Sequence, residues 1–160
     1  RRVLFRSAIS AVFDTLSLGA TVVASKNGYS GTNTLLRQKE EVKRLNVRWV
    51  DVSNTDEVLA ALLGADVMWL ESPTNPALEV ADLPFLLKSA KEMGLLVCCD
   101  NTFASALNQR PLDMGADVSM NSVSKLISGH SDLIMGSLST NDVKLFERFE
   151  IHRKIGRAHV

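Results

Sequence analysis

The chain has 160 residues, 46% of them hydrophobic, which is enough for one domain with a core that can surround a cofactor cleft. Its 18 Lys and Arg balance 18 Asp and Glu, so no net field attracts nucleic acid or an anionic membrane. The longest apolar runs, such as 95–99, are far shorter than the roughly 20 residues that cross a bilayer, so we expect no membrane span.

Short β-branched or apolar runs alternate with amphipathic stretches along the first half of the chain. In order, we predict a strand at 21–24, a helix at 32–45, a strand at 47–52, a helix at 55–63 and a strand at 66–70. In the first helix, the residues expected to face the core are Leu35, Leu36, Val42 and Leu45. This alternation predicts βαβ units.

The second half continues the pattern after a rigid loop, E-S-P-T-N-P, whose two prolines exclude regular structure. We then predict a helix at 82–93, a buried strand at 95–99, a strand at 118–120, a polar loop around Lys125, a strand at 133–138 and a helix from 141 onward. The predicted fold is therefore α/β, with a mainly parallel sheet flanked by helices.

Polar side chains concentrate where the predicted strands end. They form four clusters, at 29–33, 71–76, 100–103 and 121–132. Ligands of open α/β sheets bind beyond the carboxyl ends of the strands. An acid at one strand end, and a lysine flanked by hydroxyls further along the chain, are what a phosphorylated aldehyde such as pyridoxal phosphate (PLP) requires.

Five residues have side chains suited to such a site. Lys125 has the amine that can bond to the aldehyde, and Asp100 closes an apolar strand and can face the pyridine nitrogen. Ser122 and Ser124 have hydroxyls for the phosphate, and Tyr29, the only tyrosine, can stack on the ring. Taken singly, each also has an ordinary explanation as a surface lysine, a strand-end acid, a loop serine or a half-buried tyrosine.

The order of these motifs resembles the transsulfuration family of PLP enzymes, the cystathionine γ-synthase and γ-lyase group. The most specific stretch is D-V-S-M-N-S-V-S-K-L-I-S-G-H-S-D at 117–132. The supporting stretches are W-L-E-S-P-T-N-P at 69–76, V-C-C-D-N-T-F at 97–103, Q-R-P-L-D-M-G-A-D at 109–117 and Y-S-G-T-N at 29–33. The resemblance implies the large PLP-binding domain of the fold type I, aspartate aminotransferase-like enzymes, present here in incomplete form.

The resemblance also implies a role at each matching position. Lys125 would bond to PLP and move protons between substrate carbons, and Asp100 would pair with the pyridinium nitrogen. Tyr29 would stack on the ring and assist proton transfer. The remaining implied positions are Ser122 and Ser124 at the phosphate, Asn75 at the phenolic oxygen, Thr102 beside the cofactor and Glu71 in the cleft wall. No metal ligand is expected.

The chain departs from the family pattern near Lys125 and at both ends. Ser124 and Leu126 stand where the family has a threonine and an aromatic residue, and residues 5–7 replace a Ser-Gly-Met phosphate turn. Residues 1–7 and 155–160 resemble translated adapter DNA, with frayed helix ends as the alternative; we expect a natural segment at 8–154. The C-terminal substrate domain is expected to be missing, which would leave this fragment inactive.

The implied activity is that of a PLP-dependent carbon–sulfur lyase or transferase. It would eliminate or replace a group at the γ-carbon of cystathionine or activated homoserine, with methionine γ-lyase or O-acylhomoserine sulfhydrylase as alternatives. A non-catalytic α/β binding domain is the alternative of another class. We expect a small sulfur amino-acid substrate, a homotetramer built as a dimer of dimers, and a cytoplasmic location, since the adjacent Cys98 and Cys99 are poor disulfide partners.

Overall fold

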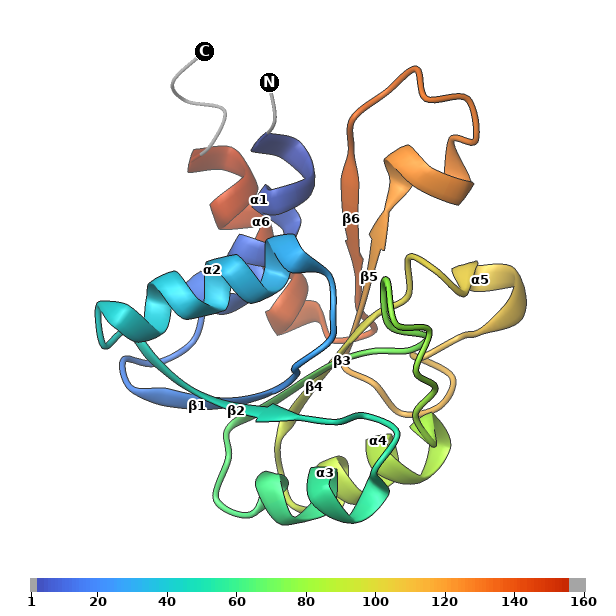
Figure 1. Cartoon of the computed structure of the whole chain (residues 1–160). Coiled ribbons are helices and arrows are strands. Elements are labelled where there is room, and N and C mark those ends of the chain that lie inside the picture. The colour runs from blue at the N-terminus through green and yellow to red at the C-terminus, as the bar shows by residue number, and fades with distance from the viewer. Residues whose placement is uncertain (1–2, 156–160) are drawn as a thin grey trace.

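A computed structural model describes residues 3–155, with side chains described from 7 to 152 (Figure 1). The strands are β1 (Ala20–Ser25), β2 (Leu45–Val50), β3 (Val67–Glu71), β4 (Leu96–Asp100), β5 (Val118–Ser122) and β6 (Gly136–Ser139). The helices are α1 (Val3–Asp14), α2 (Ser30–Glu41), α3 (Thr55–Leu62), α4 (Leu83–Glu92), α5 (Ser105–Asn108), the π-helical turn η1 (Val123–Ile127) and α6 (Val143–Ile155). The expected non-native ends lie partly outside the described residues, so that expectation stays a prediction.

The six strands form one sheet in the order β2-β1-β3-β4-β5-β6. Five strands pair in parallel, and β6 runs antiparallel to β5. The sequence prediction of a mainly parallel sheet is therefore confirmed. Because parallel strands end at one edge, the loops that follow β1, β3, β4 and β5 meet there.

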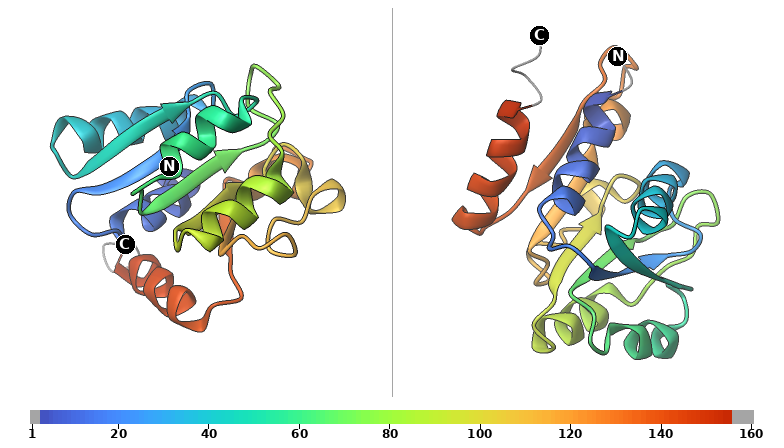
Figure 2. Two further views of the ribbon diagram at one scale, coloured as in Figure 1. Left: turned by 90° about the horizontal axis from the view of Figure 1, so that it is seen from below. Right: turned by 90° about the vertical axis from the view of Figure 1, so that its left-hand side faces the viewer.

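Helices cover both faces of the sheet, as Figure 2 shows from two further directions: α1, α2 and α6 on one face, and α3 and α4 on the other. Strand β3 supplies both cores, because successive side chains of a strand point to opposite faces. Met68 and Leu70 pack toward α3 and α4, whereas Trp69 packs toward α1, where its ring lies 5.0 Å from that of Phe13. Cys98 and Cys99 likewise enter opposite cores as free thiols.

The predicted helix at 32–45 is too long. Helix α2 ends at Glu41, Lys43 adopts a left-handed φ of 53°, and β2 begins at Leu45. Leu36 is buried as predicted, but Val42 is 73% exposed, so its assignment to the inner face was wrong. The chain turns between Glu41 and Leu45, and Leu45 is buried as the first residue of β2.

Further elements differ from the sequence prediction, among them η1, which takes the place of the polar loop predicted around Lys125. Helix α1 was not predicted, although Ile9, Val12 and Phe13 follow helical spacing and are buried. The strand predicted at 133–138 is shifted, since β6 spans Gly136–Ser139. The part of the chain described by the structure contains no helix that is long and apolar enough to cross a membrane.

Candidate active site

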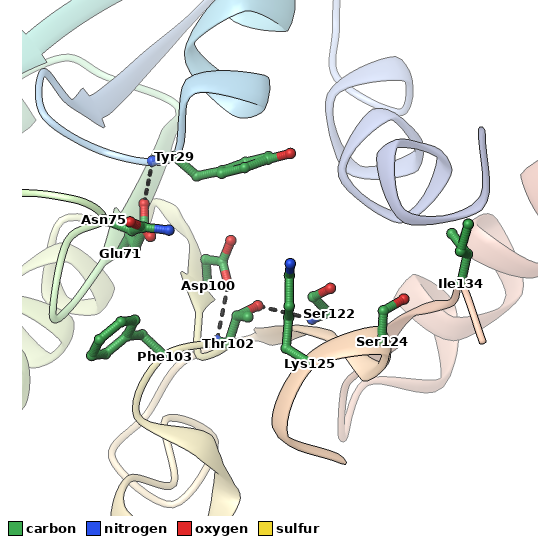
Figure 3. A pocket seen from close by; sticks show the side chains of 10 residues that line it. All are labelled: Tyr29, Glu71, Asn75, Asp100, Thr102, Phe103, Ser122, Ser124, Lys125 and Ile134. Atoms are coloured by element: carbon green, nitrogen blue, oxygen red, sulfur yellow. Dashed lines mark hydrogen bonds between the residues drawn. The ribbon is translucent and has the colours of Figure 1, made fainter. Parts of the chain in front are cut away.

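A cavity of about 280 Å³ opens at the sheet edge where β3, β4 and β5 end (Figure 3). Its lining residues are Tyr29, Glu71, Asn75, Asp100, Thr102, Phe103, Ser122, Ser124, Lys125 and Ile134. All seven residues predicted to bind the cofactor are among them, as is Glu71. Residues that are far apart in the sequence therefore share one cavity.

Lys125 is presented by the π-helical turn that follows β5. The turn is closed by the hydrogen bonds from Ser128 N to Val123 O and from Gly129 N to Lys125 O, both 2.8 Å long. Lys125 itself departs from helical geometry, with φ −93° and ψ −115°, and its exposed side chain points into the cavity (Figure 3). A π-turn of this kind is often found at functional sites.

Asp100 ends β4 with a carboxyl group that is only 3% exposed. Its Oδ1 accepts a hydrogen bond of 3.0 Å from Thr102 N. Burial raises the pKa of Asp100, and the hydrogen bonds from Thr102 oppose that increase. A buried carboxylate is costly unless a cation meets it, so this position suits a protonated ring nitrogen.

Thr102 connects the strand that carries Asp100 to the strand that carries Lys125. While its backbone N–H donates to Asp100, its Oγ1 accepts from Ser122 N at 2.8 Å. The link fixes the end of β5 beside the end of β4, just before the turn that holds Lys125. Thr102 therefore adds to the strand pairing that places the acid beside the segment with the amine.

Glu71 is a second buried carboxyl group, 6% exposed, at the end of β3 and in register with Asp100. It accepts a hydrogen bond of 2.5 Å from the backbone N–H of Tyr29. Burial, followed by repulsion from Asp100, raises the pKa of Glu71 to about 8, against the opposing effect of backbone hydrogen bonds from Tyr29 and Asn75. The two acids therefore do not both carry a full charge at neutral pH.

Tyr29 precedes α2, and its ring extends over the cavity on the side opposite Lys125 (Figure 3). The ring lies against Gly31, where an added Cβ would overlap Cε1 and come within 2.8 Å of Cζ. Only a residue without a side chain at position 31 permits this ring position. The ring can therefore cover a flat heterocycle that enters the cavity.

Ser122 and Ser124 differ in the hydrogen bonds that they already make within the protein. Ser122 is 3% exposed and its backbone N–H is bonded to Thr102. The Ser124 hydroxyl accepts from Met135 N at 2.7 Å and donates to Met135 O at 3.3 Å. To donate to a phosphate, the Ser124 hydroxyl must first turn away from Met135 O.

Two lining residues, Phe103 and Ile134, were not predicted as site residues. Phe103 is the last residue of the V-C-C-D-N-T-F motif at 97–103, so its place in the chain was a usable signal. Ile134 carries no local signal, because it lies in the loop before β6 and reaches the cavity through contacts across the fold, such as the bonds between its neighbour Met135 and Ser124. They are apolar lining residues at opposite ends of the cavity (Figure 3).

The side chains present fit PLP. They comprise a primary amine, a buried carboxyl for the ring nitrogen, an aromatic face and hydroxyl groups around one cavity. The described residues contain no group of three or more His, Cys, Asp or Glu that could hold a metal ion.

The family of Cys/Met metabolism PLP-dependent enzymes matches residues 4–159. The chain belongs to this family. Its fold is that of the family's PLP-dependent enzymes, and PLP is the family's cofactor.

Several family members are similar to this chain. A probable cystathionine gamma-synthase of Herpetosiphon aurantiacus is 35% identical, over 84% of this chain and 43% of that protein. The chloroplastic cystathionine beta-lyase of Arabidopsis thaliana is 38% identical, over 87% of this chain and 30% of that protein. The solved cystathione gamma lyase (CalE6) of Micromonospora echinospora superimposes with a TM-score of 0.90 and 34% identity, covering 96% of this chain and 41% of that one. The chain thus spans less than half the length of these relatives.

Proposed function

We propose that this chain forms the cofactor-binding part of a PLP-dependent carbon–sulfur lyase or transferase that acts on cystathionine or an activated homoserine. The observation that supports this most is the shared cavity, which brings the Lys125 amine, the buried Asp100 carboxyl and the Tyr29 ring together. Relatives named cystathionine gamma-synthase and gamma-lyase, and a solved gamma synthase in complex with cystathionine, support the substrate class.

PLP, when bound, supplies an electron sink for the pair of electrons left when the substrate loses its Cα proton. Lys125 would hold the cofactor through its amine and would also take up and return protons at the substrate carbons. Asp100 keeps the ring nitrogen protonated, because a buried carboxylate is stabilised by a facing cation. Tyr29 stacks on the ring and assists proton transfer to the leaving group.

The other polar groups of the cavity hold and orient the cofactor. Ser122 and Ser124 bind the phosphate, Asn75 lies at the phenolic oxygen, and Thr102 keeps Asp100 in place beside the ring. Their positions around one cavity support these assignments. We further propose that the intact protein is a homotetramer in the cytoplasm. The location varies among relatives, since one of them is chloroplastic.

The reaction is tested by product analysis. The PLP-saturated protein is incubated with L-cystathionine, with L-methionine, or with O-acylhomoserine plus cysteine or sulfide, and the products are separated by mass spectrometry. We expect either 2-oxobutanoate, ammonia and cysteine from cystathionine, or cystathionine from acylhomoserine and cysteine. Methanethiol from methionine, or homocysteine from acylhomoserine and sulfide, would favour the alternative activities. No turnover in a yellow, PLP-saturated intact protein would reject the proposal.

A non-catalytic α/β binding domain remains the alternative of another class. It predicts that the intact protein stays colourless when it is given excess PLP. The proposed enzyme predicts the yellow absorbance of a lysine-bound cofactor, which borohydride abolishes.

A further inference from the structure

Glu71 lies at the back of the cavity and touches the loop that carries Tyr29. We propose that Glu71 is a positioning residue, whose carboxyl group holds the Tyr29 loop so that the aromatic ring covers the cavity. The proposal rests on the proposed function only in assigning the ring to the cofactor. The hydrogen bond from Tyr29 N–H to Glu71 forms without any bound cofactor.

Helix α2 begins without a capping side chain of its own. Tyr29 is the N-cap residue of α2, and no side-chain capping hydrogen bond is present. In a capping box, a Glu or Gln three residues later accepts the N–H of the N-cap residue. That position here is Thr32, whose buried hydroxyl makes no hydrogen bond. The acceptor comes instead from Glu71, 42 residues further along the chain.

The second observation is the close fit of the loop around the carboxyl group. A Cβ added at Gly28 would lie 3.0 Å from Glu71 Oε2 and 3.3 Å from the Cβ of Ser25. A methyl group at position 28 would therefore crowd the Glu71 carboxyl group, which shows how closely the loop approaches it. A second hydrogen bond joins the loop that carries Tyr29 to the loop that follows β3, since Asn27 Nδ2 donates to Glu79 Oε1 at 2.6 Å.

The third observation is that the carboxyl group serves as an acceptor in a buried place. Glu71 is 6% exposed, and its pKa of about 8 leaves it largely protonated at neutral pH. A protonated carboxyl group still accepts a hydrogen bond through its carbonyl oxygen. Glutamine has the same shape and the same acceptor, so Glu71→Gln should preserve the link, whereas Glu71→Leu should remove it.

The direct test is hydrogen exchange of the Tyr29 amide, measured by NMR in the cofactor-free protein. We expect Glu71→Leu to speed exchange about tenfold or more, because the amide loses its acceptor. Glu71→Gln should stay within about twofold of the wild type. Unchanged exchange in Glu71→Leu, or equal acceleration in Glu71→Gln, would overturn the proposal.

A double-mutant cycle then tests whether Glu71 acts through the ring. The PLP dissociation constants of Glu71→Leu, Tyr29→Leu and the double variant are compared. We expect each single change to weaken binding several-fold and the double variant to be no weaker than Tyr29→Leu. Additive losses would mean that Glu71 acts on PLP independently, against the proposal. A wild type that binds no PLP would instead reject the proposed function and leave the exchange result to decide the positioning role.

Glu57 provides the matched control. Its Oε1 accepts a hydrogen bond of 3.0 Å from Asp51 N, so it also holds a loop, but it does not line the cavity. Glu57→Leu should leave Tyr29 exchange and PLP affinity unchanged. Should Glu71→Leu fail to fold, Glu71→Ala also removes the acceptor and should speed Tyr29 exchange in the same way. Unchanged exchange in that variant would equally overturn the proposal.

Discussion

Tyr29 reaches its position over the cavity because Gly31 has no side chain. Position 31 lies inside α2 with an ordinary helical backbone, so alanine fits the backbone and in fact favours the helix. Its methyl group, however, needs the space that the Tyr29 ring occupies. Stability and cofactor binding should therefore respond in opposite directions to this one substitution.

We predict that Gly31→Ala weakens PLP binding by roughly two- to tenfold, the loss expected when a stacked ring is displaced. Its unfolding midpoint in urea should be equal to that of the wild type or higher. Ser30→Ala, an exposed position in the same turn, serves as the control and should leave PLP affinity unchanged. Affinity equal to the wild type in Gly31→Ala would contradict the assigned ring position.

The raised pKa of Glu71 makes a prediction about pH in the cofactor-free protein. The folded state holds the proton up to a pKa of about 8, whereas the unfolded state releases it near 4.5. Between these values the folded state binds more protons, so its stability falls as the pH rises. We expect this group to lower the unfolding free energy by on the order of 2 to 4 kcal/mol between pH 5 and pH 8.

Urea unfolding at several pH values measures that decrease. Glu71→Gln cannot ionise, so its unfolding free energy should fall less over the same range than that of the wild type. Titrating groups far from Glu71 contribute equally to both proteins, so the difference between the two curves reports Glu71 together with its repulsion of Asp100. Parallel curves would show that Glu71 is already ionised in the folded protein at pH 5.

Among the elements, the ends of β4 and β5 matter most, because they carry the acid and the amine. Their parallel pairing brings Asp100 opposite Met120, and the Thr102 side chain extends the link to Ser122 beyond the last paired residues. The π-helical turn then follows at once and turns Lys125 into the cavity. The strand pairing and the Thr102 hydroxyl together therefore set the spacing between the acid and the amine.

Thr102→Val removes that hydroxyl with little change in shape and leaves the Ser122 N–H without its acceptor. We expect a loss of about 1 to 3 kcal/mol in unfolding free energy, together with weaker PLP binding. Thr140 is a control, since its Oγ1 accepts from Asp142 N in an exposed turn, where water replaces the lost bond. Thr140→Val should cost less than about 1 kcal/mol and should not affect PLP.

Considering the whole molecule, the sequence predicts the layers of the fold well and the ends of its elements less well. Continuous apolar runs identified strands such as β3 and β4, whose residues are almost all buried. The helix was predicted to continue through Val42 because the helical spacing of apolar residues continues past Glu41. The structure instead ends α2 at Glu41 and starts β2 at Leu45. Helix α1 was missed although Ile9, Val12 and Phe13 show helical spacing within the expected natural segment 8–154.

For the candidate site, the sequence likewise predicts some features and leaves others out. The lysine, the acid and the tyrosine were predicted from strand ends and from the motif order, and the structure places them in one cavity. Contacts made across the fold could not be predicted. The sequence does not show that Glu71 holds Tyr29, that Met135 engages Ser124, or that Ile134 reaches the cavity.

The central claim is that Lys125 and Asp100 hold one PLP molecule between them. Borohydride reduction of the PLP-loaded protein, followed by peptide mass spectrometry, tests it directly. We predict that the added pyridoxyl mass falls on Lys125, that Lys125→Ala loses the yellow absorbance, that the exposed Lys88→Ala retains it, and that Asp100→Ala binds PLP far more weakly. A pyridoxyl group on another lysine, or full PLP affinity in Asp100→Ala, would contradict the claim.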